Sequence, residues 1–141
     1  MNTEQHSIAL EVIKQVNLYF ETNCTIQSKE TDVVRPRMYA YKLIRDLTKM
    51  KLADIGLMFL RTHGAVIHGI NNVEHDIENI RRYREYFVSL LGIIQSTDVY
   101  MNSSIGKKDS LNNLRVEIFN ILASKSDKEL KEILKTIHNG T

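Results

Sequence analysis

Three short segments with helical spacing of apolar residues follow one another between residues 35 and 77, with only a few residues between them. Apolar side chains three or four positions apart lie on one face of a helix. Isolated helices this short are marginal in water, so the segments must bury their apolar faces against one another. The succession is typical of a helix-turn-helix, in which a tight turn joins two packed helices.

Residues before this region predict one further helix and a loop. Residues 4–22 place apolar side chains at amphipathic spacing, which predicts a helix with one buried stripe. Residues 23–34 are polar and β-branched and are expected to form a loop. Pro36 is favourable in the first turn of a helix, because its missing N–H would be unpaired there anyway. A helix is therefore expected from Pro36 to about residue 50.

The next two helices form the core of the predicted motif. A short helix is expected over residues 53–59, followed by a turn at Leu60 and Arg61. A longer helix then begins near Thr62, a residue type favoured at the N-cap. Residues 75–86 either bend this helix or continue it to about residue 91. Its inner stripe is expected to consist of Val66, Ile67, Ile70, Val73 and Ile77.

The C-terminal third of the chain has a different composition. Residues 92–109 are rich in Ser, Asn and Gly and predict a linker or long loop. Two more amphipathic helices are expected, over residues 110–123 and after a capping box that starts at Ser126. No segment alternates with the period of a strand. We therefore predict an all-α protein with a helix-turn-helix domain over 1–91, a linker over 92–109 and a C-terminal helical pair over 110–141 that packs on it.

Several classes of protein are disfavoured by the sequence. The single Cys24 cannot form an intramolecular disulfide or a structural zinc site on its own, and it suits a reducing compartment. No apolar run approaches the ~20 residues that span a bilayer, and the N-terminus lacks the features of a signal peptide. A cytoplasmic protein without a membrane partner is expected.

Catalytic and metal sites are also not expected. His63 and His68 lie about 140° apart around a helix, and His68 and His75 lie about 10 Å apart along it, so neither pair makes a good chelate. Cys24 has no histidine near it in the sequence, and no glycine-rich phosphate loop is present. His68 is instead expected to pack beside Phe59. The sequence predicts no catalytic residue, no metal and no cofactor, and hence a protein that is not an enzyme.

Positive charge is concentrated in the region of the predicted motif. Residues 35–63 carry seven basic and two acidic side chains, whereas the net charge of the whole chain is only +2. Such a local excess is consistent either with a surface that faces phosphates or with a solvated helix face. The basic residues are Arg35, Arg37, Lys42, Arg45, Lys49, Lys51 and Arg61.

The runs RPRMYAYKLIRDLT, KLADIG and RTHGAVIHGI, with Phe59 between the last two, resemble a known family. They are similar to the C-terminal DNA-binding domain of the bacterial replication initiator DnaA, and the resemblance covers roughly residues 5–80. It implies a helix-turn-helix bundle of the DnaA and Trp-repressor type. One residue is missing between Phe59 and Arg61, where the family usually has a Gly-Gly turn.

The resemblance implies double-stranded DNA as the partner and assigns roles to individual residues. The helix that carries His63 would enter the major groove, and the positions that read bases are Thr62, His63, Gly64 and Ala65. Basic side chains would hold phosphates, which positions the protein without selecting a sequence. The residues expected in this role are Arg35, Arg37, Arg45, Lys49 and Arg61.

Departures from the family pattern leave a second interpretation open. Gly64 and Ala65 replace two hydroxyl residues, Met38 replaces a glutamine, and only Lys29 represents the basic loop that precedes the family's Arg-Pro-Arg start. No ATPase segment accompanies the module, so a stand-alone derivative is expected, in transcription regulation or replication and in a phage or other mobile element. The alternative is a protein-interaction or inhibitory adaptor that keeps the fold without specific DNA binding.

A homodimer or another protein partner is a further possibility. The apolar run over residues 87–94 is too rich in large side chains to face solvent. It is expected either to pack under the C-terminal helices or to form a homodimer contact. The C-terminal helices are a second candidate for such a contact. A dimer would suit a helix-turn-helix protein that reads a two-fold symmetric DNA site.

Overall fold

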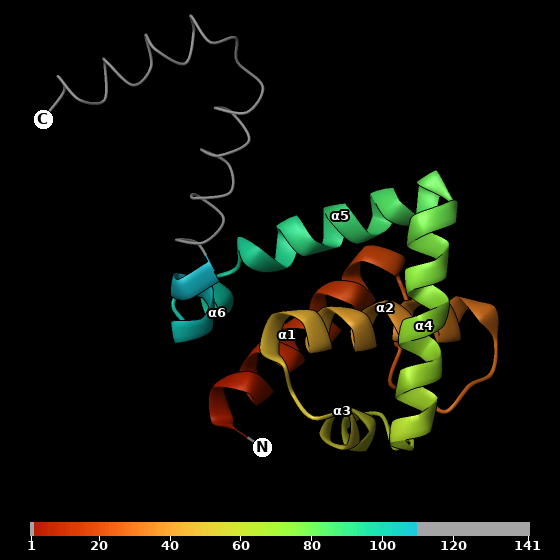
Figure 1. Ribbon diagram of the computed structural model, residues 1–141, viewed down its shortest axis with the longest axis horizontal. Coiled ribbons are helices and arrows are strands. Elements are labelled where there is room, and N and C mark those ends of the chain that lie inside the picture. Colours follow the sequence, from red (N-terminus) through yellow and green to blue (C-terminus); the bar gives the residue numbers. More distant parts are fainter. Residues whose placement is uncertain (1, 110–141) are drawn as a thin grey trace, which may run out of the picture. The chain divides into compact units, whose positions relative to one another are not determined.

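A computed structural model describes residues 2–109 of the chain, and this part is built from α-helices (Figure 1). The all-α prediction is confirmed for the described residues, which contain no strand. The first compact unit ends at Ile105. The expected helices beyond residue 109 lie outside the described part. The helices are α1 (Thr3–Phe20), α2 (Thr31–Thr48), α3 (Leu52–Met58), α4 (His63–Asn79), α5 (Arg81–Gln95) and α6 (Asp98–Met101).

The first helix has the amphipathic character that its sequence predicts. The side chain of Asn2 caps α1 by accepting hydrogen bonds from the backbone N–H groups of Glu4 (2.8 Å) and Gln5 (3.4 Å). This cap satisfies donors that the first turn would otherwise leave unpaired. The helix ends where Glu21 adopts the left-handed conformation. Its buried stripe consists of Ile8, Ala9, Val12, Ile13 and Val16.

The second helix begins five residues earlier than predicted. It starts at Thr31, so Pro36 lies inside the helix rather than in its first turn. A proline inside a helix leaves the carbonyl four residues earlier without its intrahelical donor. Here that carbonyl belongs to Asp32, which lies in the exposed first turn where water can replace the donor. Burial of Val33 also favours the longer helix.

The turn between α3 and α4 is short because one residue adopts an unusual backbone conformation. Leu60 has φ 55°, in the left-handed region. The N–H of Arg61 donates to the carbonyl of Gly56 at 2.8 Å, and the N–H of Leu60 donates to that of Leu57 at 3.3 Å. These two bonds form a Schellman motif that closes α3. A turn with one left-handed residue, Leu60, therefore stands where the family that the sequence resembles usually has a longer Gly-Gly turn.

Helices α2 and α4 cross at very close range, which places α4 at one side of the bundle (Figure 1). A Cβ atom on Gly69 would lie 2.8 Å from Cδ2 of Tyr41 and 3.2 Å from Cγ of Met38. Glycine is therefore required at this crossing. Tyr41 also packs edge to face with Phe59, with ring centroids 4.9 Å apart. Val66 and Val73 are buried in the same core as predicted, whereas Ile67 is 39% exposed, against prediction.

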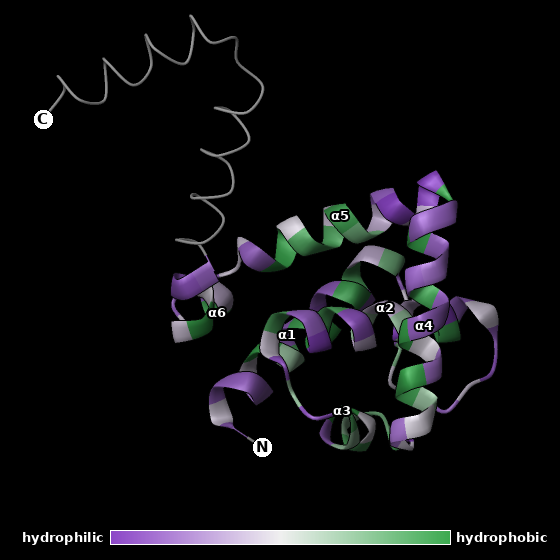
Figure 2. Ribbon diagram, in the orientation of Figure 1, coloured by the Kyte–Doolittle hydropathy of each residue, from purple (hydrophilic) through white to green (hydrophobic). Residues whose placement is uncertain are grey.

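The chain beyond α4 is more helical than predicted. An extended residue, Ile80 (φ −127°, ψ 112°), separates α4 from α5, so of the two alternatives for residues 75–86 the structure favours a bend over a continuous helix. Residues 92–109 were expected to form a linker or long loop. They instead complete α5, form α6 and are helical again over 104–109. The reason is burial: Figure 2 shows the middle of α5 as mainly hydrophobic, and Ile94 and Tyr100 lie in the core.

Candidate nucleic-acid interface

The first turn of α4 is exposed to solvent. Thr62 is its N-cap, as predicted, and its side-chain oxygen accepts a hydrogen bond from the N–H of Ala65 at 3.2 Å. His63, Gly64 and Ala65 are exposed beside it. A Cβ atom on Gly64 would find only the side chain of Thr62 nearby, at 3.8 Å. The first turn of α4 is therefore open to solvent, and no side chain covers its surface at Gly64.

The exposed face of α4 continues beyond the four residues that sequence analysis selected. Ile67, His68 and Asn71 are also exposed. They lie three, four and seven positions after Gly64, which places them on the same helix face. His68 is exposed and lies within hydrogen-bonding distance of Asn72, at 3.2 Å, so its expected packing beside Phe59 stays a prediction. The spacing of these three residues from Gly64 is the sequence signal that could have identified this face.

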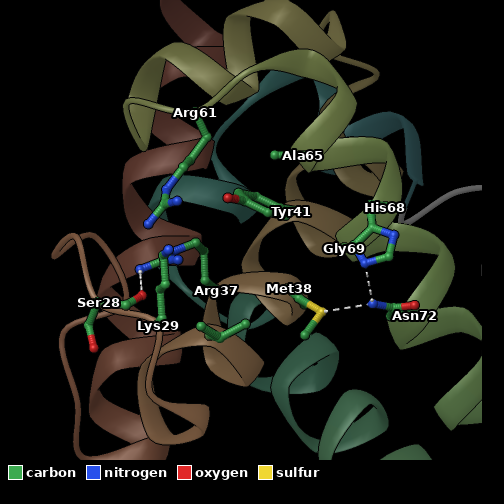
Figure 3. A pocket seen from close by; sticks show the side chains of 11 residues that line it. Ser28, Lys29, Arg37, Met38, Tyr41, Arg61, Ala65, His68, Gly69 and Asn72 are labelled. Carbon is green, nitrogen blue, oxygen red and sulfur yellow. Dashed lines mark hydrogen bonds between the residues drawn. The ribbon is translucent and has the colours of Figure 1, made fainter.

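One side of α4 borders a pocket with basic side chains. The pocket has a volume of about 240 Å³ and is lined by Ala65 and His68 of α4, by Arg61 and by Lys29 of the loop before α2. Figure 3 shows Arg61 and Arg37 extending toward each other from opposite sides of it. The Nε atom of Arg61 is buried and has no hydrogen-bond partner within residues 2–109. This side of α4 is therefore suited to an anion.

The other side of α4 also carries a basic residue. Arg45 lines a hollow together with Ile67, Asn71 and Glu74 of α4 and Leu52 of α3, and Glu74 forms an ion pair with Lys42 at 3.2 Å. Its NH1 donates to the carbonyl of Met50 at 2.6 Å, which helps to close the C-terminal end of α2. The remaining guanidinium donors lie at a partly exposed position. The exposed face of α4 is thus flanked by cations on both sides.

Arg37 does not have the surface role that the resemblance implies. Its side chain is only 4% exposed. The Nε atom donates to the carbonyl of Cys24 at 2.9 Å, and one terminal nitrogen donates to the carbonyls of Ile26 and Ser28. Arg37 therefore holds the loop before α2 in place, and the expectation that it contacts a phosphate at the surface is corrected. Burial first, and the charge of Arg61 second, lower the pKa of Arg37.

Arg35 is also occupied within the protein. Its NH1 forms an ion pair with the carboxylate of Asp76 on α4 at 2.9 Å. Its guanidinium carbon lies 4.2 Å from the ring centroid of Tyr83 on α5. Arg35 connects three helices, but its side chain is still 30% exposed, so the expected phosphate contact stays a prediction. Lys49, by contrast, is exposed at the end of α2.

The basic residues at the start of α5 mostly bond to the protein. Arg84 donates to the carbonyls of Ile77 (2.9 Å) and Glu78 (3.0 Å) at the end of α4. Arg81 forms an ion pair with Glu85 at 2.9 Å. Because these donors satisfy helix ends and i, i+4 pairs, the face of α4 is the better candidate for a nucleic-acid contact.

The described part of the chain has neither a cluster of metal-binding side chains nor a membrane-spanning helix. Across residues 2–109, no three His, Cys, Asp or Glu side chains are grouped so that they could hold a metal ion. None of the helices in the same range is both long and apolar enough to cross a bilayer. Cys24 is buried with a free thiol, and burial raises its pKa to about 11.

Comparison with known proteins adds an independent observation. The family described as "Bacterial dnaA protein helix-turn-helix" matches residues 6–73. The chromosomal replication initiator protein DnaA of Lachnoclostridium phytofermentans is 37% identical over 71 residues, which is 48% of this chain and 16% of the relative. The proteins of the same name from Deinococcus deserti and Rickettsia canadensis are 35% and 41% identical over 71 and 66 residues. The match spans 16% and 14% of these two relatives and 48% and 46% of this chain.

Proposed function

Because residues 6–73 belong to the bacterial DnaA helix-turn-helix family, we propose that this protein binds double-stranded DNA and that α4 enters the major groove. The observation that carries the proposal is the exposed tip of α4 between two basic flanks. The major groove is about 12 Å wide and admits one α-helix with its side chains. A phosphate backbone then lies on each side of the helix.

Each flank of α4 is proposed to neutralise one DNA strand. Arg61 and Lys29 would contact the backbone on one side, and Arg45 the backbone on the other, with Lys49 as a further cation at the end of α2. Thr62 and the three residues after it would contact base edges. Phosphate contacts set the position and orientation, whereas contacts to base edges select the sequence.

The biological setting is proposed on the same basis. The relatives are named as initiators of chromosomal replication, which favours a role in DNA replication over a role in transcription regulation. The chain spans about a sixth of the length of these relatives, so their full activity does not transfer to it. We propose that the protein acts on cytoplasmic DNA without catalysing a reaction.

Duplex binding at two salt concentrations tests this proposal. Fluorescence anisotropy with duplexes retained from a random pool should show an affinity that falls with salt, with a slope of about −0.9 per phosphate contact. Arg61→Met and Lys29→Met should each reduce that slope by about one contact. Lys14→Met is the matched control, because Lys14 is an exposed cation on α1, away from α4. No retained duplex, or equal slopes in all three variants, would contradict the proposal.

The adaptor alternative has one structural observation in its favour. Leu57 and Leu60, at the α3–α4 turn, are 67% and 78% exposed. Large apolar side chains at one exposed turn are suited to a protein partner. The adaptor function replaces the DNA proposal if the pool experiment retains no duplex and if Leu57→Ser and Leu60→Ser weaken a protein complex isolated by cross-linking.

The structure leaves only part of the apolar run over 87–94 exposed for the proposed homodimer contact. Leu90 and Ile94 of the apolar run over 87–94 are buried in the core, which leaves Val88 (61% exposed) and Ile93 (39% exposed) for a contact between copies. Sedimentation of the full chain tests this proposal. Val88→Asp should shift a dimer toward the monomer, and a monomeric wild type at all concentrations would exclude the contact.

A further inference from the structure

We infer that Ile67 and Asn71, on the second and third turns of α4, read A·T base pairs in the major groove. The inference rests on the proposed DNA binding and specifies what part of the site it recognises. It moves the centre of base recognition along α4, away from the first turn. The main evidence for the inference is the residue composition and the exposure of one face of α4.

The exposed face of α4 lacks the residues of an ordinary solvated helix. Gly64, Ile67, His68 and Asn71 share this face and are exposed. Residues 63–73 contain no Asp, Glu, Lys or Arg, and the first acidic residue that follows, the exposed Glu74, is paired with Lys42 at 3.2 Å. A solvent-facing helix surface normally carries charged residues, and glycine, isoleucine and asparagine are less favourable there than alanine or glutamate. Because helix stability does not explain these residues, an interaction of the face is the better explanation.

Ile67 and Asn71 form a pair within that face. They are four positions apart, so their Cβ atoms lie about 5–6 Å from each other on the helix surface. Both line the hollow beside Arg45. Within residues 2–109 the structure gives no hydrogen bond to the amide of Asn71, whereas the amide of neighbouring Asn72 lies near His68 and Met38. The Asn71 amide is therefore available for an external partner.

The chemistry of this pair matches one kind of base pair. An asparagine amide accepts from the N6 amino group of adenine and donates to its N7, and an apolar side chain contacts the methyl group of thymine. Gly64 and Ala65 carry no side-chain donor or acceptor, so they supply no polar group that reads a base. Their small size instead allows α4 to approach the base edges closely. Arg45 would hold the nearby phosphate and fix the position of the pair.

Base analogues test this inference directly. Duplexes retained by the wild-type protein from a random pool are resynthesised with 7-deazaadenine, which lacks N7, or with uracil, which lacks the methyl group, at each A·T pair in turn. At one or two adjacent pairs, 7-deazaadenine should weaken wild-type binding about tenfold, and uracil about fourfold. Asn71→Ala should remove the first effect, and Ile67→Ala the second.

Asn79→Ala is the matched control, because Asn79 is an exposed asparagine two turns further along α4. It should keep both analogue effects. The inference is overturned if the duplexes are retained but neither analogue weakens wild-type binding, or if Asn71→Ala keeps the full 7-deazaadenine effect. Failure to retain any duplex overturns the proposed function as well, so the two failures are distinguishable. Circular dichroism checks that each variant is folded.

Discussion

Replacing Arg37 by methionine should destabilise the fold, because the structure gives this arginine a structural role. Its guanidinium donates to three carbonyls of residues 24, 26 and 28. Net contributions of hydrogen bonds to charged groups are about 1.5–3 kcal/mol each. Desolvation of the guanidinium offsets part of that total, so we expect a loss of about 3 kcal/mol. For a chain of this length the loss corresponds to a decrease of about 10 °C in Tm.

Arg61→Met is the matched control for this prediction. The positive charges of Arg61 and Arg37 repel each other across the same pocket. The Nε of Arg61 has no hydrogen-bond partner in the described part of the chain. Arg61→Met should therefore leave Tm unchanged or slightly raised, while it weakens duplex binding. Thermal unfolding followed by circular dichroism measures both variants. A Tm of Arg37→Met within about 2 °C of the wild type would refute the structural role of Arg37.

Three further predictions concern backbone geometry and pH. Leu60→Gly should raise the free energy of unfolding by about 0.5–1 kcal/mol in urea, because a left-handed L-residue costs about 1–2 kcal/mol and the added freedom of the unfolded chain offsets part of the gain. Gly56→Ala should lower Tm by several degrees, because its Cβ would overlap the carbonyl oxygen of Arg61; an unchanged Tm would contradict the tight α3–α4 turn. Burial raises the pKa of the Cys24 thiol from 9.0 to about 11, so its contribution to stability is complete below pH 9 and is lost as pH rises toward 11. Cys24→Ala should remove the part of the decline in urea midpoint that the thiol causes as pH rises from 9 toward 11. Identical pH profiles of the wild type and the variant would show that the thiol has the same pKa in the folded and unfolded states.

Local sequence signals were sufficient for the helices of the motif. The apolar spacing of residues 4–22 and the N-cap residue Thr62 predicted α1 and the start of α4 within one or two positions. Capping and amphipathic spacing act within one or two turns, so they can be recognised without tertiary information. The exposure of residues 62–65 could be anticipated from the same pattern.

Tertiary contacts decided what the sequence could not. Arg37 was expected at a surface because the family resemblance implies a phosphate contact there, but the loop before α2 offers it three carbonyls. Pro36 was expected to start α2, but burial of Val33 extends the helix before it. Residues 92–109 were expected to form a linker because of their composition, although Ile94 and Tyr100 complete the core. In each case a partner distant in sequence outweighed the local preference.

A titration of ¹⁵N-labelled protein with a retained duplex, followed by NMR, tests the central claim most directly. If α4 enters the major groove, the largest changes in amide shifts should occur at residues 62–71, with smaller changes at Lys29 and Arg45 and none along the exposed side of α1. Shifts centred on α5 instead, or none at saturating duplex, would contradict the account.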